Sequence, residues 1–229
     1  MNVAVIRFPG ANCDQDAYFA LRDDVGVGAE YVWHENTSLN GFDAVFLPGG
    51  FSYGDYLRCG AMASHAPVMA EVRRFAEEGK PVIGACNGFQ VLCEAGLLPG
   101  ALLQNVAEKF LCKDVYVLAE NRTSIWTHGV SQVLRIPIAH GEGRYVADEE
   151  TLQELEENGR IAFRYVDPAG HRTDDSNANG SLHAIAGVVN EQGNVLGLMP
   201  HPERATRTIL GSADGLQILN ALRLVSSNR

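Results

Sequence analysis

One cysteine of the chain has neighbours suited to nucleophilic catalysis. Cys86 is the centre of Gly84-Ala85-Cys86-Asn87-Gly88, which follows an apolar run and precedes a helical pattern. This is the G-x-nucleophile-x-G form of a nucleophile elbow, a sharp turn that lifts the side chain out of a sheet and needs glycines at its flanks. The N-terminus of the following helix favours a thiolate. The pattern predicts a nucleophile, and the alternative is a buried cysteine that acts as a small hydrophobic residue.

A histidine and a carboxylate downstream complete the set, because a catalytic thiol needs a base and the base needs an orienting group. His201-Pro202-Glu203 follows an apolar run that ends at Met199. In an extended segment, residues i and i+2 point to the same side, and Pro202 fixes one backbone torsion between them. We therefore predict that Glu203 orients His201 and that His201 is the base for Cys86. An exposed turn that carries a charge is the alternative.

A glycine turn offers hydrogen-bond donors for the same chemistry. Attack on an amide carbonyl creates an oxyanion that preorganised N–H groups stabilise. Pro48-Gly49-Gly50-Phe51 follows another apolar run, and no Cβ atom shields the amides of its glycines. We expect the N–H groups of Gly50 and Asn87 to be the donors, although a plain tight turn has the same composition.

The elements that position these residues follow from the alternation of apolar runs with amphipathic segments. In the first half this alternation favours a parallel sheet covered on both faces, and Cys86 and His201 both follow strands at their carboxyl ends, where open α/β sheets build their sites. The predicted strands there are 3–8, 30–34, 43–47 and 81–85, and the predicted helices are 14–25, 65–78 and 87–95.

After about residue 115 the pattern changes to strands with few helices between them. We expect several of these strands to be antiparallel and to extend or flank the main sheet. No linker marks a boundary, so we predict a single domain over residues 1–229. The predicted strands are 115–118, 124–127, 133–139, 161–166, 185–189 and 195–199, and the predicted helices are 149–157 and 214–225.

The composition argues against several classes of function. The chain has 18 Lys and Arg against 28 Asp and Glu, a net charge of −10, which suits neither nucleic acid nor an anionic membrane surface. No run approaches the roughly 20 apolar residues of a spanning helix, and no signal peptide is visible. The five cysteines form no C-x-x-C pair. We therefore expect no disulfide framework, no metal site and a reduced, cytoplasmic protein.

Longer motifs spread over the chain resemble those of the class I glutamine amidotransferases. The resemblance rests on the elbow extended to Gln90, on the Pro-Gly-Gly turn and on the His-Pro-Glu segment. Further segments look like the amidotransferase subunits of phosphoribosylformylglycinamidine synthase; they are 48–58, 137–145, 177–181 and 199–204. The resemblance implies a flavodoxin-like, open and mostly parallel central sheet with helices on both faces and additional antiparallel strands.

The same resemblance implies roles for individual residues. Cys86 would form a glutamyl thioester, with His201 and Glu203 as the other members of a catalytic triad. The residues that would contact the substrate or its oxyanion are Gly50, Asn87, Gln90, His140 and Gly141. Of these, His140 and Gly141 lie in the loop that approaches the α-amino end of glutamine in relatives. A turn histidine with a local hydrogen bond is the alternative for His140.

The partners expected from the resemblance supply what the chain lacks. It has no G-x-x-x-x-G-K-[ST] loop and no carboxylate cluster suited to Mg²⁺, so we expect no cofactor on this chain. The resemblance implies a large synthetase subunit that uses ATP and Mg²⁺ and receives ammonia for purine biosynthesis, together with a small accessory subunit. Asp55, Tyr56 and Arg58 would lie on the surface that meets a partner. We expect little glutaminase activity before docking.

Three alternatives stay open on the sequence. The first is an amidotransferase for another synthetase, or a free-standing glutaminase. The second is a glutamine-sensing module without turnover, which a complete set of Cys86, His201 and Glu203 argues against because a sensor needs no activated thiolate. The third is a cysteine hydrolase or redox protein on a related sheet.

Overall fold

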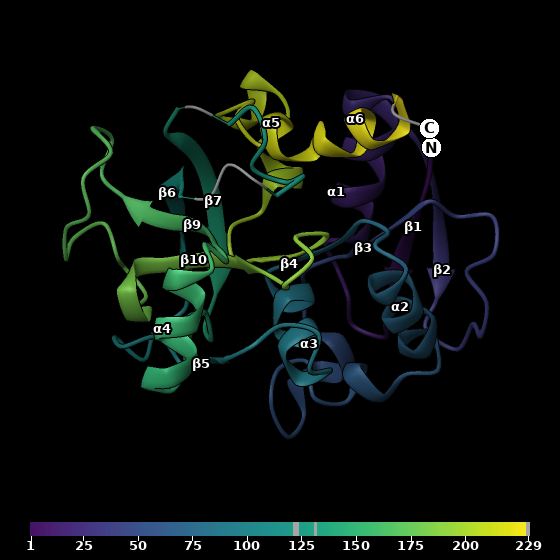
Figure 1. Cartoon of the computed structure of the whole chain (residues 1–229), viewed down its shortest axis with the longest axis horizontal. Helices are drawn as coiled ribbons and strands as arrows, with labels where there is room; N and C mark the ends of the chain where they lie inside the picture. The colour runs from purple at the N-terminus through teal and green to yellow at the C-terminus, as the bar shows by residue number, and fades with distance from the viewer. Residues whose placement is uncertain (121–123, 131, 228–229) are drawn as a thin grey trace.

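The computed structural model describes residues 1–120, 124–130 and 132–227, and within them nine strands form one mixed sheet (Figure 1). Two further strands, β5 and β8, pair separately. The strands are β1 (Asn2–Arg7), β2 (Gly28–Trp33), β3 (Ala44–Leu47), β4 (Val82–Ala85), β5 (Ala101–Leu103), β6 (Leu111–Ala119), β7 (Leu134–His140), β8 (Arg144–Val146), β9 (Ile161–Val166), β10 (Ile185–Val189) and β11 (Val195–Leu198). The order across the large sheet is β2-β1-β3-β4-β11-β10-β9-β6-β7.

Helices and short turns connect these strands. The α-helices are α1 (Asp14–Phe19), α2 (Val68–Glu77), α3 (Asn87–Glu94), α4 (Glu149–Glu157), α5 (Leu216–Leu219) and α6 (Ala221–Ser227), and the π-helical segment η1 (Ala20–Val25) continues α1. The 3₁₀ turns are η2 (Ser52–Asp55), η3 (Ala63–His65), η4 (Leu182–Ala184), η5 (Pro202–Arg204) and η6 (Thr208–Leu210). Among the helices described here, none has the length and apolar character needed to cross a bilayer.

The half of the sheet from β2 to β11 is parallel and covered on both faces. Successive side chains of a strand point to opposite faces, so each strand contributes to two cores. Val3 and Val5 of β1 belong to the core that includes α5 and α6, whereas Ala4 and Ile6 belong to the core that includes α2, α3 and α4. Figure 1 shows α1, α5 and α6 on one side of the sheet and α2 and α3 on the other.

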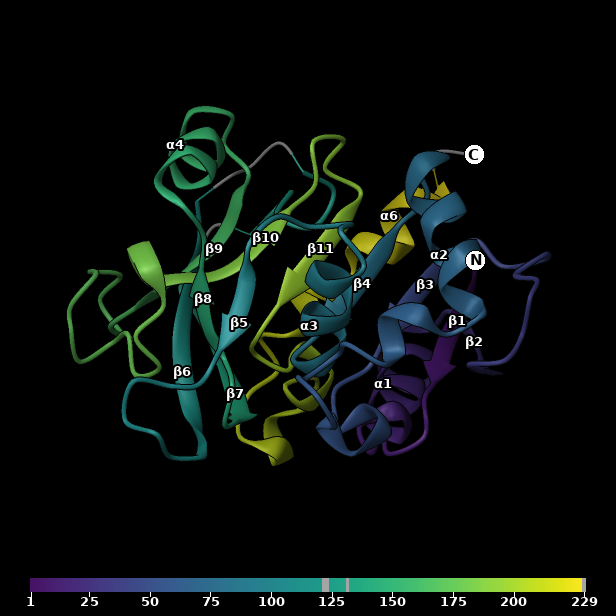
Figure 2. The same ribbon diagram turned by 90° about the horizontal axis from the view of Figure 1, so that it is seen from below.

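The other half of the sheet is antiparallel. The pairs β11–β10, β10–β9, β9–β6 and β6–β7 all run in opposite directions. The small β5–β8 sheet lies beside α3 (Figure 2). The prediction of an open α/β sheet with helices on both faces and additional antiparallel strands is confirmed. The two three-residue strands β5 and β8 were not predicted, because so short a run carries no alternation pattern.

Some predictions of secondary structure are wrong. Residues 124–127 form a turn rather than a strand, since the Ser124 Oγ and Thr127 Oγ1 atoms lie 2.8 Å apart and the His128 N–H donates to the Ser124 carbonyl. Trp126, within this turn, is buried and donates its Nε1–H to the Asn194 carbonyl at 3.0 Å. The helix predicted over 214–225 is divided into α5 and α6.

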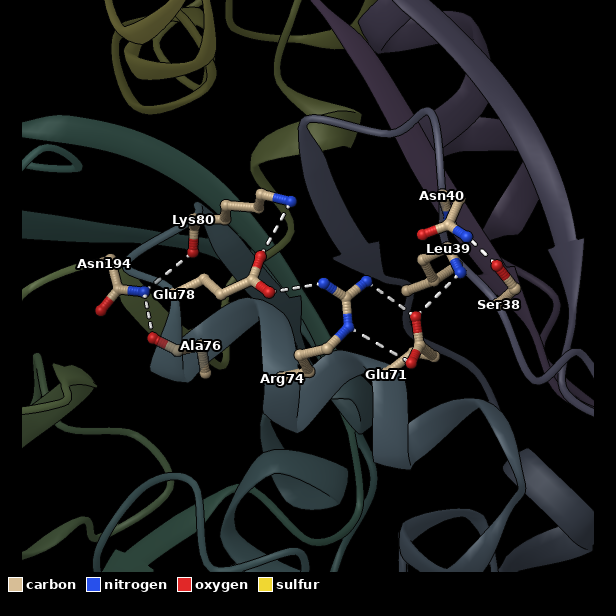
Figure 3. A network of polar contacts seen from close by, with 9 residues as sticks. All are labelled: Ser38, Leu39, Asn40, Glu71, Arg74, Ala76, Glu78, Lys80 and Asn194. Atoms are coloured by element: carbon tan, nitrogen blue, oxygen red, sulfur yellow. Dashed lines mark hydrogen bonds and ion pairs between the residues drawn. The ribbon is translucent and has the colours of Figure 1, made fainter.

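A polar network ties α2 to the turn that leads into β11 (Figure 3). Arg74 donates to Glu71 at 2.8 Å and to Glu78 at 2.5 Å on the surface of α2. The buried side chain of Asn194 donates to the carbonyls of Ala76 and Lys80 at 2.9 and 2.8 Å. Because Asn194 directly precedes β11, these bonds hold that strand against β4, and the two strands together lead into the site described next.

Candidate active site

Two neighbouring parallel strands bring Cys86 and His201 together. Ala85, the last residue of β4, is paired with Leu198, the last residue of β11. Cys86 follows directly and donates its backbone N–H to the Leu198 carbonyl at 2.8 Å, while His201 comes three residues after β11. Both residues therefore lie at the carboxyl edge of the sheet, as the sequence predicted.

The backbone at Cys86 has the strained geometry of a nucleophile elbow. Its torsions are φ 50° and ψ −108°, a region that residues with a Cβ rarely adopt, and α3 begins at the next residue. A Cβ atom on Gly84 would lie 2.5 Å from the Gly88 carbonyl oxygen, and one on Gly88 would lie 2.0 Å from the Leu47 carbonyl oxygen. Glycine at both flanks therefore lets α3 pack against β3 and β4 while Cys86 stands at the turn.

His201 and Glu203 form a buried pair. Nδ1 of His201 lies 2.7 Å from Oε1 of Glu203. The backbone that achieves this differs from the prediction: Pro202 to Arg204 form the 3₁₀ turn η5 rather than an extended segment. His201 itself stays outside the turn with φ −100° and ψ 87°, so its ring can still meet the carboxylate two residues later.

The charges around His201 favour its protonated form. Burial opposes a charged imidazole, but the Glu203 carboxylate and Cys86 raise the pKa of His201 to about 10. Within the part of the chain that the structure describes, Nε2 of His201 is buried without a hydrogen-bond partner. Because Glu203 occupies Nδ1, Nε2 is the nitrogen left to exchange a proton with Cys86. The arrangement is suited to a thiolate beside an imidazolium.

The glycine turn lies against this pair. A Cβ atom on Gly49 would be 2.7 Å from Cε1 of His201 and 3.3 Å from Cβ of Cys86, so only glycine fits. Gly49 was not predicted as a site residue, although its place before Gly50 in the turn was the available signal. Gly50 has φ 131°, and a Cβ there would lie 2.5 Å from the backbone nitrogen of Asn12. Among the described residues, neither the Gly50 nor the Asn87 N–H donates to a protein acceptor, so both are available to an oxyanion.

Gln90 joins the elbow to the loop after β7. Its Nε2 donates to the Glu142 carbonyl at 2.6 Å, and its Oε1 accepts from Nδ2 of Asn87 at 2.8 Å. The Oδ1 atom of Asn87 in turn accepts from the Ser52 N–H at 3.2 Å. Gln90 and Asn87 thus connect three segments around Cys86: the glycine turn, α3 and the loop that contains Gly141.

His140 and Gly141 are held by Asn105. Nδ1 of His140 lies 3.1 Å from Oδ1 of Asn105, and the Asn105 N–H donates to the Gly141 carbonyl at 2.9 Å. Burial and the positive charge of His201 lower the pKa of His140 to about 4, so its ring is neutral. Asn105, which the sequence analysis missed, carries no motif that could reveal this contact.

Cys13 is a second thiol near the triad. Its Sγ accepts a hydrogen bond from Nη2 of Arg204 at 3.1 Å. Sγ of Cys13, a ring nitrogen of His201 and a carboxylate oxygen of Glu203 all lie within 4.8 Å of one another. Burial and the Glu203 carboxylate raise the pKa of Cys13 to about 12, although Arg204 opposes the shift. No role was predicted for Cys13, since nothing local in the sequence links it to residues so far along the chain.

Residues 1–215 match the model of the CobB/CobQ-like glutamine amidotransferase domain family. The PurQ subunits of phosphoribosylformylglycinamidine synthase from two strains of Thermus thermophilus are each 61% identical to the chain over 220 residues, which is 94% of this chain and 95% of the relative.

Solved structures agree with this relationship. The PurLQS structure from Thermotoga maritima contains a chain that is 43% identical, with a TM-score of 0.87 and 98% of both chains covered. Another glutamine amidotransferase from Thermotoga maritima shares the fold alone, at 17% identity and a TM-score of 0.56, with 91% of this chain and 79% of that chain covered. The chain therefore belongs to the CobB/CobQ-like glutamine amidotransferase family, in which the PurQ subunits are similar to it over almost their whole length.

Proposed function

We propose that this chain is the glutaminase subunit of a phosphoribosylformylglycinamidine synthase. It hydrolyses glutamine to glutamate and ammonia, and it delivers the ammonia to an ATP-dependent synthetase subunit of de novo purine biosynthesis. The observation that carries the proposal is the buried His201–Glu203 pair beside the elbow at Cys86, in a chain 61% identical to PurQ subunits.

The first half of the reaction forms a thioester. The Cys86 thiolate attacks the side-chain amide carbon of glutamine, and the N–H groups of Gly50 and Asn87 stabilise the oxyanion. As the C–N bond breaks, Nε2–H of His201 gives its proton to the leaving nitrogen, and ammonia departs. Glu203 holds Nδ1–H throughout, so that Nε2 is the nitrogen that faces the reaction.

The second half restores the enzyme. Water attacks the thioester carbon while Nε2 of His201 takes a proton from it, and the C–S bond breaks to return the Cys86 thiolate and release glutamate. Gln90, with the loop of His140 and Gly141 that it contacts, holds the glutamine in place. The thiolate and imidazolium are then ready for another cycle.

The synthetase chemistry belongs to partner subunits. The chain has no P-loop sequence, so we infer that ATP and Mg²⁺ bind to the large synthetase subunit, and that a small accessory subunit completes the complex. Ammonia is mostly protonated in neutral water and loses its nucleophilicity there, which favours transfer inside a complex. The PurLQS assembly of the Thermotoga maritima relative supports this inference. We place the complex in the cytoplasm, where its cysteines stay reduced.

The segment after the glycine turn is the surface that we assign to the synthetase. Tyr56 and Leu57 are 73% and 93% exposed, and Tyr53, Asp55 and Leu57 all have positive φ. Large apolar side chains that are held outward in a strained backbone are typical of contact surfaces rather than of free loops. The segment starts at the oxyanion turn, so docking here can adjust the active site.

Affinity labelling tests the nucleophile and the role of the partner. A diazo-ketone analogue of norleucine is added to the purified chain with and without the candidate synthetase subunits, and the adduct is located by peptide mass. We expect labelling at Cys86 that is faster in the complex and is lost in His201→Ala. A Cys112→Ser variant, which removes an exposed thiol, serves as the control and should label normally. Labelling at Cys59, or none at Cys86 in the complex, would refute the assignment.

A further inference from the structure

A single buried asparagine holds the turn that follows β7. Asn105, which is 1% exposed, lies between β5 and β6. Its Nδ2 group donates to the carbonyls of His140 and Lys109, each at 2.9 Å. Its Oδ1 atom accepts from the Gly143 N–H at 3.0 Å and lies 3.1 Å from Nδ1 of His140. Three of these four contacts are with the turn from residue 140 to residue 143.

These contacts determine which nitrogen of His140 carries the proton. Nδ2 of Asn105 faces two carbonyl oxygens, which only accept, so the atom that faces Nδ1 of His140 is the amide oxygen. That oxygen has no proton to donate, and the proton between the two atoms is therefore on Nδ1. Burial and the positive charge of His201 lower the pKa of His140 to about 4, so the ring has one N–H only. Nε2 is left with a free lone pair.

This lone pair is buried and has no protein donor. His140 is 3% exposed, and within the described residues its Nε2 has no hydrogen-bond partner. A Cβ atom on Gly143 would lie 2.2 Å from Cε1 of His140, so the ring packs directly on the backbone of that glycine. Because a buried acceptor without a donor is unfavourable, the position favours a ligand that carries an N–H or O–H group.

The place of His140 relates this acceptor to the substrate. Sγ of Cys86 lies 3.7 Å from the carbonyl oxygen of Ala139, the residue before His140. In the proposed reaction the side-chain amide of glutamine is held at Cys86 by the oxyanion donors and by His201. The carboxylate of glutamine has no proton to donate, whereas its α-ammonium group is a donor only. The α-ammonium is therefore the group that matches the lone pair.

We propose that Asn105 is a positioning residue that makes His140 a hydrogen-bond acceptor for the α-ammonium group of glutamine. Asn105 does not touch the substrate. It holds the ring through Nδ1, so that Nε2 accepts a hydrogen bond from the ammonium. The site then selects amides that carry an α-amino group over those that lack one. This role rests on the proposed function, to which it adds the substrate group that is recognised.

The position of the proton can be measured in the isolated full-length chain. Long-range proton–nitrogen correlation NMR of the isotope-labelled chain distinguishes the two neutral forms of an imidazole from the imidazolium. At neutral pH we expect His140 of the wild type to carry its proton on Nδ1. In Asn105→Asp the new carboxylate favours a second proton on the ring, so we expect an imidazolium. A wild-type ring with its proton on Nε2 would overturn the proposal.

Selection of the α-ammonium is tested by steady-state turnover in the assembled complex. The substrates are glutamine and glutaramate, which lacks the α-amino group. The wild type should prefer glutamine in kcat/KM by about tenfold or more, as expected for a hydrogen bond to a charged group. In Asn105→Asp, Nε2 becomes a donor, so the preference should fall by about tenfold. The loss should come from a higher KM for glutamine, with kcat and the KM for glutaramate little changed.

A second asparagine provides the matched control. Asn190 also accepts a backbone N–H, from Val195 at 3.0 Å, but it lies before β11 at the edge of the sheet opposite the site. Asn190→Asp should therefore keep the wild-type preference for glutamine.

A double-mutant cycle separates control of the proton from general support of the turn. His140→Gln replaces the ring by an amide that cannot gain a proton, so in this background Asn105→Asp should change the preference by less than about twofold. Equal losses in both backgrounds would overturn the proposal. No turnover of glutamine by the wild-type complex would refute the proposed function and, with it, the assignment of the ammonium. Normal turnover with an unchanged preference in Asn105→Asp would refute the role of Asn105 alone.

Discussion

Nδ1 of His201 lies 2.7 Å from Oε1 of Glu203, and the two side chains are buried almost completely. In such surroundings a single hydrogen bond fixes both the orientation of the ring and the position of its proton. It leaves Nε2 for Cys86, and it explains why the pKa of His201 is raised despite burial. The catalytic proposal depends on this contact.

Replacement of Glu203 by glutamine should show how much its negative charge contributes to catalysis. Glu203→Gln keeps the size of the side chain but no longer stabilises the imidazolium, and the amide allows the wrong tautomer. We expect kcat of the assembled complex to fall on the order of 10³–10⁴-fold, by analogy with the loss of a triad carboxylate in serine proteases. Steady-state glutaminase assays measure this. A loss below about tenfold would show that Glu203 is dispensable for catalysis.

Even one added methyl group at Gly49 should lower turnover. In Gly49→Ala the added Cβ would lie 2.7 Å from Cε1 of His201, so the ring must shift from its position beside Cys86. We expect a loss of about 100-fold or more in turnover, as for other displacements of catalytic groups by roughly an ångström. Gly96→Ala is the control, since a Cβ there meets open space although φ is +67°. It should lower stability by about 1 kcal/mol and leave turnover unchanged.

Stability should depend on pH through His201. Because the pKa of His201 is raised to about 10 in the folded chain, the imidazolium stabilises the fold. This contribution is fully present below the unfolded value of about 6.5 and is lost as pH rises towards the folded value. Urea unfolding at a series of pH values should therefore show a decline in the free energy of unfolding over that interval. In Glu203→Gln the decline should be smaller, and an identical profile in both proteins would contradict the assignment.

Docking should depend on the exposed segment after the glycine turn. Leu57→Asp places a charge where the side chain is 93% exposed, so the free energy of unfolding should change little. If Leu57 contacts the synthetase, Kd for the complex should rise by about tenfold or more. Ile209→Asp is the matched control, since Ile209 is 89% exposed in a separate turn, η6. Equal effects of the two variants on Kd would argue against a specific role for the segment.

Local sequence was enough for the features that depend on neighbours along the chain. Apolar runs and glycines identified the strands and the elbow at Cys86, because strand periodicity and turn geometry are properties of a few consecutive residues. The proximity of His201 and Glu203 was likewise predictable from two residues and a proline between them, although the turn that joins them proved to be 3₁₀. The family followed from the whole set of motifs. The catalytic roles, and the single domain over residues 1–229, stay predictions.

Tertiary structure alone decided which distant residues share the site. The register of β4 with β11 aligns Ala85 with Leu198 and so brings Cys86 beside His201, a pairing across more than a hundred residues. The spacing of the cysteines predicted no metal site, and Cys13 carries no motif. Yet the loop before α1 places its sulfur within 4.8 Å of donor atoms in His201 and Glu203. Contacts of this kind depend on the packing of strands and helices against one another, which no local pattern records.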